Sequence, residues 1–182
     1  MLLWMALALG ASPLEVNLTE AEKAQLSAGD VVVRYPTDSG LVVGAIDIPA
    51  SREQVMKTVM DFDARVKSVG AIDAIETYAP ATDPKGLGAK FTLSIVGTEI
   101  VYYIRYDIDD EGCNFKLDKD KENGIVDTNG GYWTYPAGDK IRLVYWSTTD
   151  TGRSVPGFIR NGLTVRSFRN QLTAMRELAP KK

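Results

Sequence analysis

Apolar residues recur at intervals of three and four in two long segments of the chain, which is the spacing of one helix face. The first segment begins at Ser51, with Gln54 three residues on as in a capping box, and we expect a helix from there to Val66. The second begins near Pro156 and keeps its apolar stripe almost to the end of the chain, so it predicts the longest helix. A shorter segment, residues 19–26, opens with a similar box and predicts a third helix.

Alternation of apolar and polar residues fills most of the region between the two long helices, as expected for strands with one buried face. Residues 90–95 alternate, and residues 100–108 alternate again after Gly97-Thr98, a candidate two-residue turn that would place Phe91 near Ile104. Further β-rich runs complete the pattern: 31–35, 41–48, 113–117, 125–128, 132–135 and 141–149. This order of elements predicts an α+β fold, in which antiparallel strands carry helices on one face.

The start of the chain, from Met1 to Ala11, is an unbroken run of apolar or small residues. It is too short to span a bilayer, which needs about 20 residues, and it has the length of a signal-peptide core, although no Lys or Arg precedes it. A buried N-terminal helix is the alternative. We expect a signal peptide over 1–11, an extension with a short helix over 12–29 and one domain over 30–182, exported to a bacterial periplasm.

The composition of the chain excludes several kinds of catalytic, metal and binding site. The 182 residues carry a net charge of −3, which does not favour a nucleic-acid partner. The chain has no histidine and one cysteine, Cys113, which excludes histidine acid–base catalysis, internal disulfides and four-cysteine zinc sites. Asp107, Asp109, Glu111 and Asp118 approach a calcium-loop pattern, but two ligand positions depart from it and the segment joins strands, so we expect an acidic turn. We expect neither a metal nor a cofactor.

Several stretches, in this order and spacing, resemble the START-like superfamily, also called the helix-grip or SRPBCC fold. Residues 46–50, Ile-Asp-Ile-Pro-Ala, run into the helix at Ser51 like the first strand and helix of that family. Residues 131–134 and 141–146 are similar to its last hairpin, and residues 153–161 are similar to the start of its C-terminal helix. No single motif is diagnostic, and the resemblance depends on their combination.

The resemblance implies a curved antiparallel sheet wrapped around a long C-terminal α-helix, with an apolar cavity between them. The superfamily includes lipid-transfer, coenzyme-Q-binding and polyketide-cyclase proteins. The resemblance therefore implies a monomer that binds and transfers a hydrophobic ligand, such as a sterol, hopanoid, quinone or fatty-acyl lipid, with transient membrane contact. The alternative is a polyketide cyclase or dehydratase-like enzyme in the same fold, for which we identify no catalytic residue in the sequence.

The candidate ligand contacts are apolar and aromatic positions that such a cavity would collect. The candidates are Phe91, Leu93, Tyr102, Ile104 and Tyr106 from the alternating strands, Trp133, Tyr135, Val144 and Trp146 from the last hairpin, and Phe158, Ile159, Leu163, Phe168 and Leu172 from the last helix. In the last hairpin the opposite face of the strands, with Tyr132, Leu143 and Tyr145, could face inward instead.

Charged residues among these apolar strands are candidates for orienting a polar group of the ligand. They are Arg105, Asp107 and Arg142, and a solvated outer face of the sheet explains them as well. Arginines on the polar side of the last helix, such as Arg166 and Arg169, could meet anionic lipid head groups or simply face water.

Overall fold

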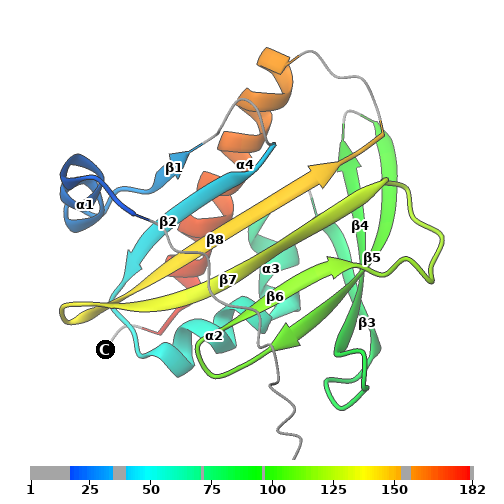
Figure 1. Ribbon diagram of the computed structural model, residues 1–182, viewed down its shortest axis with the longest axis horizontal. Coiled ribbons are helices and arrows are strands. Elements are labelled where there is room, and N and C mark those ends of the chain that lie inside the picture. Colours follow the sequence, from blue (N-terminus) through cyan, green and yellow to red (C-terminus); the bar gives the residue numbers. More distant parts are fainter. Residues whose placement is uncertain (1–16, 35–39, 71, 96, 153–156, 181–182) are drawn as a thin grey trace, which may run out of the picture.

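The computed structural model of the protein shows one antiparallel sheet that curls beneath a long helix (Figure 1). The predicted signal peptide, residues 1–11, lies outside the described residues. For residues 95 and 157–164 the structure describes the backbone alone. It describes the whole chain except residues 1–16, 35–39, 71, 96, 153–156 and 181–182.

The described residues form helices and strands in the predicted order. The helices are α1 (Glu20–Ser27), α2 (Arg52–Met60), α3 (Phe62–Ser68) and α4 (Gly157–Leu178). The strands are β1 (Val32–Arg34), β2 (Val42–Ile48), β3 (Ile72–Ala79), β4 (Leu87–Ile95), β5 (Thr98–Ile108), β6 (Gly112–Leu117), β7 (Asp127–Ala137) and β8 (Lys140–Asp150). None of these helices is long and apolar enough to cross a membrane.

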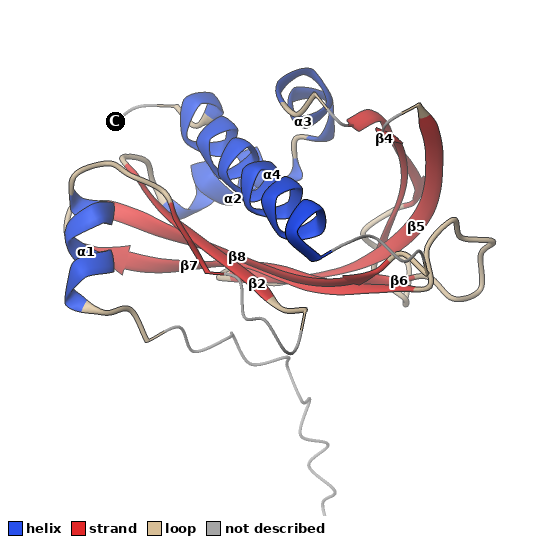
Figure 2. Ribbon diagram, turned by 90° about the horizontal axis from the view of Figure 1, so that it is seen from above, coloured by secondary structure: helices blue, strands red, loops and turns tan. Residues whose placement is uncertain are grey.

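The sheet has the strand order β1-β2-β8-β7-β6-β5-β4-β3, with every neighbouring pair antiparallel. Helices α2, α3 and α4 lie on its concave side, and β4 and β5 curl up towards them (Figure 2). Helix α1 packs at the other edge, where Leu26 joins a cluster on the outer face of β1, β2 and β8. The predicted α+β fold, with a curved sheet around the C-terminal helix, is confirmed.

Both of the capping boxes expected from the sequence are present, and they start α1 and α2. The prediction of one helix from Ser51 to Val66 is wrong, because the chain breaks at Asp61, with φ −79° and ψ 84°. The carboxylate of Asp61 accepts a hydrogen bond from the backbone N–H of Ala64 and so caps a new helix, α3. The break turns α3 and lets its residues reach the sheet.

The register of β4 and β5 also differs from the prediction. Ile95 lies opposite Thr98, and Phe91 lies opposite Tyr102 instead of Ile104. A shift of two residues keeps every side chain on its face, because side chains alternate with a period of two. The predicted inward face of both strands is therefore unchanged.

Helix α4 approaches the sheet closely where β2 carries Gly44. A Cβ atom at that position would lie 2.6 Å from Cδ1 of Leu172 and 3.3 Å from Cδ1 of Phe168. Leu172 is fully buried. The missing side chain at Gly44 therefore sets the distance between α4 and the concave face of the sheet.

We expect Gly44→Ala to lower the free energy of unfolding by about 1 to 3 kcal/mol, because the added methyl group overpacks the contact with Leu172. Urea unfolding measures this change. The matched control is Gly70→Ala, where an added Cβ would meet nothing within 4 Å and stability should change little. Equal effects of the two substitutions would contradict close packing at Gly44.

Candidate functional site

Aromatic stacking shows which face of the last hairpin meets helix α4. The ring of Tyr145 stacks on Phe168 of α4, with centroids 4.2 Å apart, and on Tyr132 of β7, with centroids 4.4 Å apart. Leu143 is fully buried in the same core cluster. The phase with Tyr132, Leu143 and Tyr145 therefore faces the helix.

The other phase, from which we chose four candidates, lies on the outer face of the sheet. Tyr135, Val144 and Trp146 pack in the cluster around Leu26 of α1. The indole N–H of Trp133 donates to the Asn114 side-chain oxygen at 3.0 Å. The prediction that these four residues face inward is wrong. Three of them pack with Leu26 of α1 and with outward side chains of β1 and β2, so both phases of this hairpin have apolar neighbours.

A cavity of about 70 Å³ lies on the concave side, between the sheet and the helices. Thr149 at its edge is exposed, whereas most of the other residues around it are buried. Its walls are mostly aromatic. They are formed by Arg65, Phe91, Tyr102, Ile104, Tyr106, Phe115, Thr128, Tyr132, Tyr145, Ser147 and Thr149.

The predicted ligand contacts divide according to their position along the fold. Phe91, Tyr102, Ile104 and Tyr106 line the cavity. Leu93 packs instead with Ile100, Leu117 and Ile125, at one end of the sheet. On α4, Phe168 covers Tyr145 and Leu172 packs at Gly44, while the side chains of Phe158, Ile159 and Leu163 lie outside the described residues.

Arg65, which is not among the candidates predicted from the sequence, projects from α3 into the aromatic wall. Only 3% of this residue is exposed. Its guanidinium carbon lies 5.8, 5.7 and 5.6 Å from the ring centroids of Phe62, Phe91 and Tyr132. One signal was available, since Arg65 falls between Phe62 and Val66 on the apolar side of the predicted helix.

The hydrogen bonds of Arg65 are few and long. Its terminal nitrogens donate to the carbonyl of Val59 at 3.4 Å and to the hydroxyl oxygens of Tyr106 and Tyr132 at 3.4 and 3.2 Å. Its Nε has no hydrogen-bond partner. No carboxylate of the described residues lies within 4 Å of the guanidinium, so this buried positive charge has no ion-pair partner there.

The titratable groups of the cavity hold fixed protonation states near neutral pH. Burial acts to lower the pKa of Arg65. The surrounding tyrosines, Tyr132 first, act in the opposite direction and raise this pKa. The net shift is upward, so the guanidinium stays charged. Burial raises the pKa of each tyrosine in the wall, to about 12 for Tyr106. The described lining thus combines one permanent cation with neutral hydroxyls and apolar rings.

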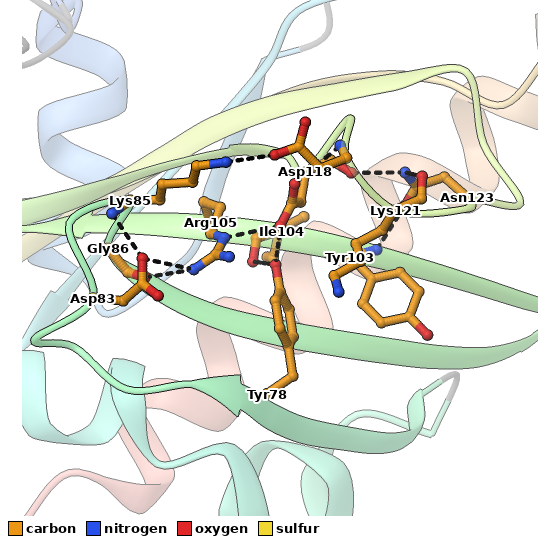
Figure 3. Close-up of polar contacts among 11 residues, drawn as sticks. Tyr78, Asp83, Lys85, Gly86, Tyr103, Ile104, Arg105, Asp118, Lys121 and Asn123 are labelled. Atoms are coloured by element: carbon orange, nitrogen blue, oxygen red, sulfur yellow. Dashed lines mark hydrogen bonds and ion pairs between the residues drawn. The ribbon is translucent and has the colours of Figure 1, made fainter.

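The charged candidates on the strands lie on the outer face. Arg105 donates from Nε to Asp118 at 2.8 Å, and its guanidinium lies 4.9 Å from the ring centroid of Tyr78 (Figure 3). Asp107 is exposed, and Arg142 pairs with Asp47 through two hydrogen bonds of 2.7 and 2.9 Å. Both arginines pair with carboxylates on the outer face, and none of the three residues lines the cavity, as the outer-face interpretation predicts.

The acidic segment after β5 forms a turn. The carboxylate of Asp109 accepts hydrogen bonds from the backbone N–H groups of Glu111 and Gly112, at 2.7 and 2.9 Å. Within the part of the chain that the structure describes, no cluster of three or more acidic or cysteine side chains is arranged to hold a metal ion.

A larger hollow, of about 600 Å³, lies between α2 and the end of α4. Six of its eight lining residues are polar or charged, among them Glu53, Lys57 and Asp61, and the other two are Leu178 and Pro180. Such a polar surface does not suit a hydrophobic ligand. The aromatic cavity under α4 is therefore the better candidate site.

Solved structures show the same fold. Neither a protein-family model nor a curated protein sequence matches the chain. A START superfamily protein from Mycobacterium smegmatis superposes with a TM-score of 0.64 at 17% identity, covering 76% of this chain and 96% of that one. A STAR-related lipid transfer protein from Xanthomonas axonopodis gives 0.62 at 21% identity, covering 81% and 90%. The Zhui aromatase/cyclase from Streptomyces sp. R1128 gives 0.59 at 14% identity, covering 76% and 92%.

These similarities show that the chain has the START-like, helix-grip fold that the sequence motifs resemble. Proteins that share the fold include one named for lipid transfer and one named as an aromatase/cyclase. In this chain the described lining of the cavity comes from the concave side of the sheet and from Arg65 of α3.

The network on the outer face has a pH dependence. Burial works to raise the pKa of Asp118, but hydrogen bonds from Tyr78 and Arg105 outweigh it and hold this pKa below its usual value. A carboxyl group with a lower pKa in the folded chain stabilises the fold above its unfolded pKa, and this contribution disappears as the pH falls through the folded pKa.

We expect Asp118→Asn to lower the free energy of unfolding at pH 7 by about 1 to 3 kcal/mol, since it removes the anion that lies 2.8 Å from a poorly exposed Arg105 and leaves only the longer contact with Asp83 at 3.4 Å. The variant should also lose less stability than the wild type on acidification below about pH 4. Urea unfolding at several pH values measures both effects. As a control, Asp120→Asn breaks an exposed ion pair with Lys85 and should change stability by less than about 0.5 kcal/mol.

Proposed function

We propose that the protein binds a hydrophobic ligand in the cavity beneath α4 and carries it through water. The observation that supports this most directly is the aromatic cavity itself, enclosed by strands β4 to β8 and by α3. A carrier of this kind overcomes the cost of exposing apolar groups to water, about 0.8 kcal/mol for each CH₂. The similarity of the fold to a lipid transfer protein agrees with the proposal.

The size of the cavity bears on how a ligand is held. A cavity of about 70 Å³ is smaller than the roughly 300 to 1,000 Å³ of typical ligand pockets. It accommodates one end of a lipid, and the remainder must move side chains that now cover the sheet. Phe168, which stacks on Tyr145, is the described side chain of α4 best placed to yield. We therefore propose that the space between α4 and the sheet widens on binding.

Transport between membranes is part of the same proposal. The apolar run from Met1 to Ala11 supports export, and the periplasm is the compartment where a soluble lipid carrier would connect two membranes. The protein would act as a monomer and touch each membrane transiently. The mass of the mature protein tests the first step, since cleavage near Ala11 would remove the run and an intact N-terminus would contradict export by this route.

The chemistry of the cavity supports binding over catalysis. Its described lining holds no carboxylate and no lysine, and burial keeps the tyrosine hydroxyls protonated. The one thiol, Cys113, is fully buried, and burial raises its pKa to about 12. A cyclase-like reaction would need a group that can accept a proton near neutral pH.

We expect Ser147→Leu to abolish uptake of hydrophobic ligands, because the larger side chain fills the cavity from β8. Displacement of an environment-sensitive fluorescent fatty acid measures uptake, and circular dichroism verifies the fold. Thr148→Leu is the control, since the neighbouring residue points to the opposite face of the sheet. Full uptake by folded Ser147→Leu would show that ligands do not enter this cavity.

A further inference from the structure

We propose that Arg65 binds a carboxylate, so that the ligand is a hydrophobic monocarboxylic acid held with its acid group at the closed end of the cavity. This inference rests on the proposed binding function and assigns a chemical class to its ligand. The carboxylate would supply the anion that the described surroundings of Arg65 do not provide.

The positive charge of Arg65 has no anion to balance it among the described residues. Only 3% of Arg65 is exposed, and no described carboxylate lies within 4 Å of its guanidinium. Removing a charge from water without an ionic partner costs several kcal/mol, so buried charges in proteins are paired almost without exception. Rings at 5.6 to 5.8 Å compensate only in part. A bound anion would complete the compensation.

The guanidinium of Arg65 also has unused hydrogen-bonding capacity. Nε of Arg65 has no partner, and the bonds that its terminal nitrogens make are 3.2 to 3.4 Å long. Nε and one terminal nitrogen form an edge of the guanidinium that matches the two oxygens of a carboxylate. A neutral hydroxyl or ketone would accept one of these hydrogen bonds and leave the charge unpaired.

The size and polarity of the cavity also suit a carboxylate. The cavity, at about 70 Å³, suits a carboxyl group with its first few carbons, and rings of Phe91, Tyr102 and Phe115 form much of its wall. No negative group of the described lining would repel the anion. A phosphate monoester, with nearly two negative charges near neutral pH, would exceed the single positive charge available. One cation in an aromatic wall therefore favours a monocarboxylate.

A purely structural role for Arg65 makes a different prediction. Its hydrogen bonds to Tyr106 and Tyr132 join α3 to the sheet, and Tyr132 also accepts from Nε2 of Gln171 at 2.6 Å. If these bonds were its purpose, Arg65→Met would destabilise the protein strongly. If Arg65 instead serves to bind an anion, Arg65→Met replaces an unpaired charge with an apolar side chain of similar volume. The ligand-free variant should then be as stable as the wild type or more stable.

The test uses the full chain, stripped of bound lipid, as wild type, Arg65→Met and Arg65→Lys. Isothermal titration calorimetry at pH 7.5 compares decanoic acid with 1-decanol, and 2-naphthoic acid with 2-naphthol. The two pairs distinguish fatty from aromatic acids. We expect the wild type to prefer the acid of at least one pair, and Arg65→Met to bind that acid at least tenfold more weakly, about the loss of one charged hydrogen bond. The neutral partner should change by less than about twofold, and Arg65→Lys should be intermediate.

The outcomes separate the two levels of the proposal. Equal affinity of the wild type for acid and neutral partner, unchanged in Arg65→Met, would overturn the carboxylate site and leave hydrophobic binding intact. Loss of acid and neutral binding together, with a large drop in melting temperature, would show a structural role. Absence of binding of all four probes to the wild type would contradict the carrier function itself. Arg65→Lys keeps the test valid should Arg65→Met not fold.

Discussion

The stack of three rings formed by Tyr132, Tyr145 and Phe168 is the contact on which the rest of the structure depends. It joins β7, β8 and α4 with centroid distances of 4.4 and 4.2 Å. It fixes which face of the last hairpin is inside. Because side chains alternate along the paired strands, the inward faces of β6, β5 and β4 are then fixed as well. The concave face becomes aromatic as a result, and the helix lies over it without filling the space at Arg65.

Arg65 gives this space its chemical character. A cavity with only rings in its wall would hold any apolar molecule of the right size, since apolar contacts discriminate weakly. A buried guanidinium with a free Nε changes the selectivity, because it penalises ligands that leave it unpaired. The cost of burying the charge lowers the stability of the ligand-free protein, and recovery of that cost on binding would contribute to affinity. Stability and ligand choice are thus linked through one side chain.

Local signals in the sequence were enough for most of the fold, because helix caps and strand alternation act over a few residues. The box of Ser51 and Gln54 starts α2, and the alternation in β4 and β5 identifies Phe91, Tyr102, Ile104 and Tyr106 as inward-facing. The break at Asp61 was missed, since the apolar spacing continues across it and only the tertiary packing of α3 favours a new cap.

The site was less predictable than the fold for two physical reasons. Both faces of the last hairpin carry apolar clusters, one that includes Leu172 of α4 and one that includes Leu26 of α1. Hydrophobicity therefore cannot distinguish Tyr132 from Trp133. Arg65 was overlooked because arginine is seldom buried without a partner. Its position between apolar residues of the predicted helix was the only trace of its role.

The protonation of a bound acid tests the central claim most directly. Decanoic acid labelled with ¹³C at its carboxyl carbon can be titrated by NMR while bound to the protein. If the acid group lies against Arg65, the guanidinium stabilises the ionised form, and its pKa should fall below the value measured in water. A pKa raised above that value, as burial among rings alone would cause, would contradict the account.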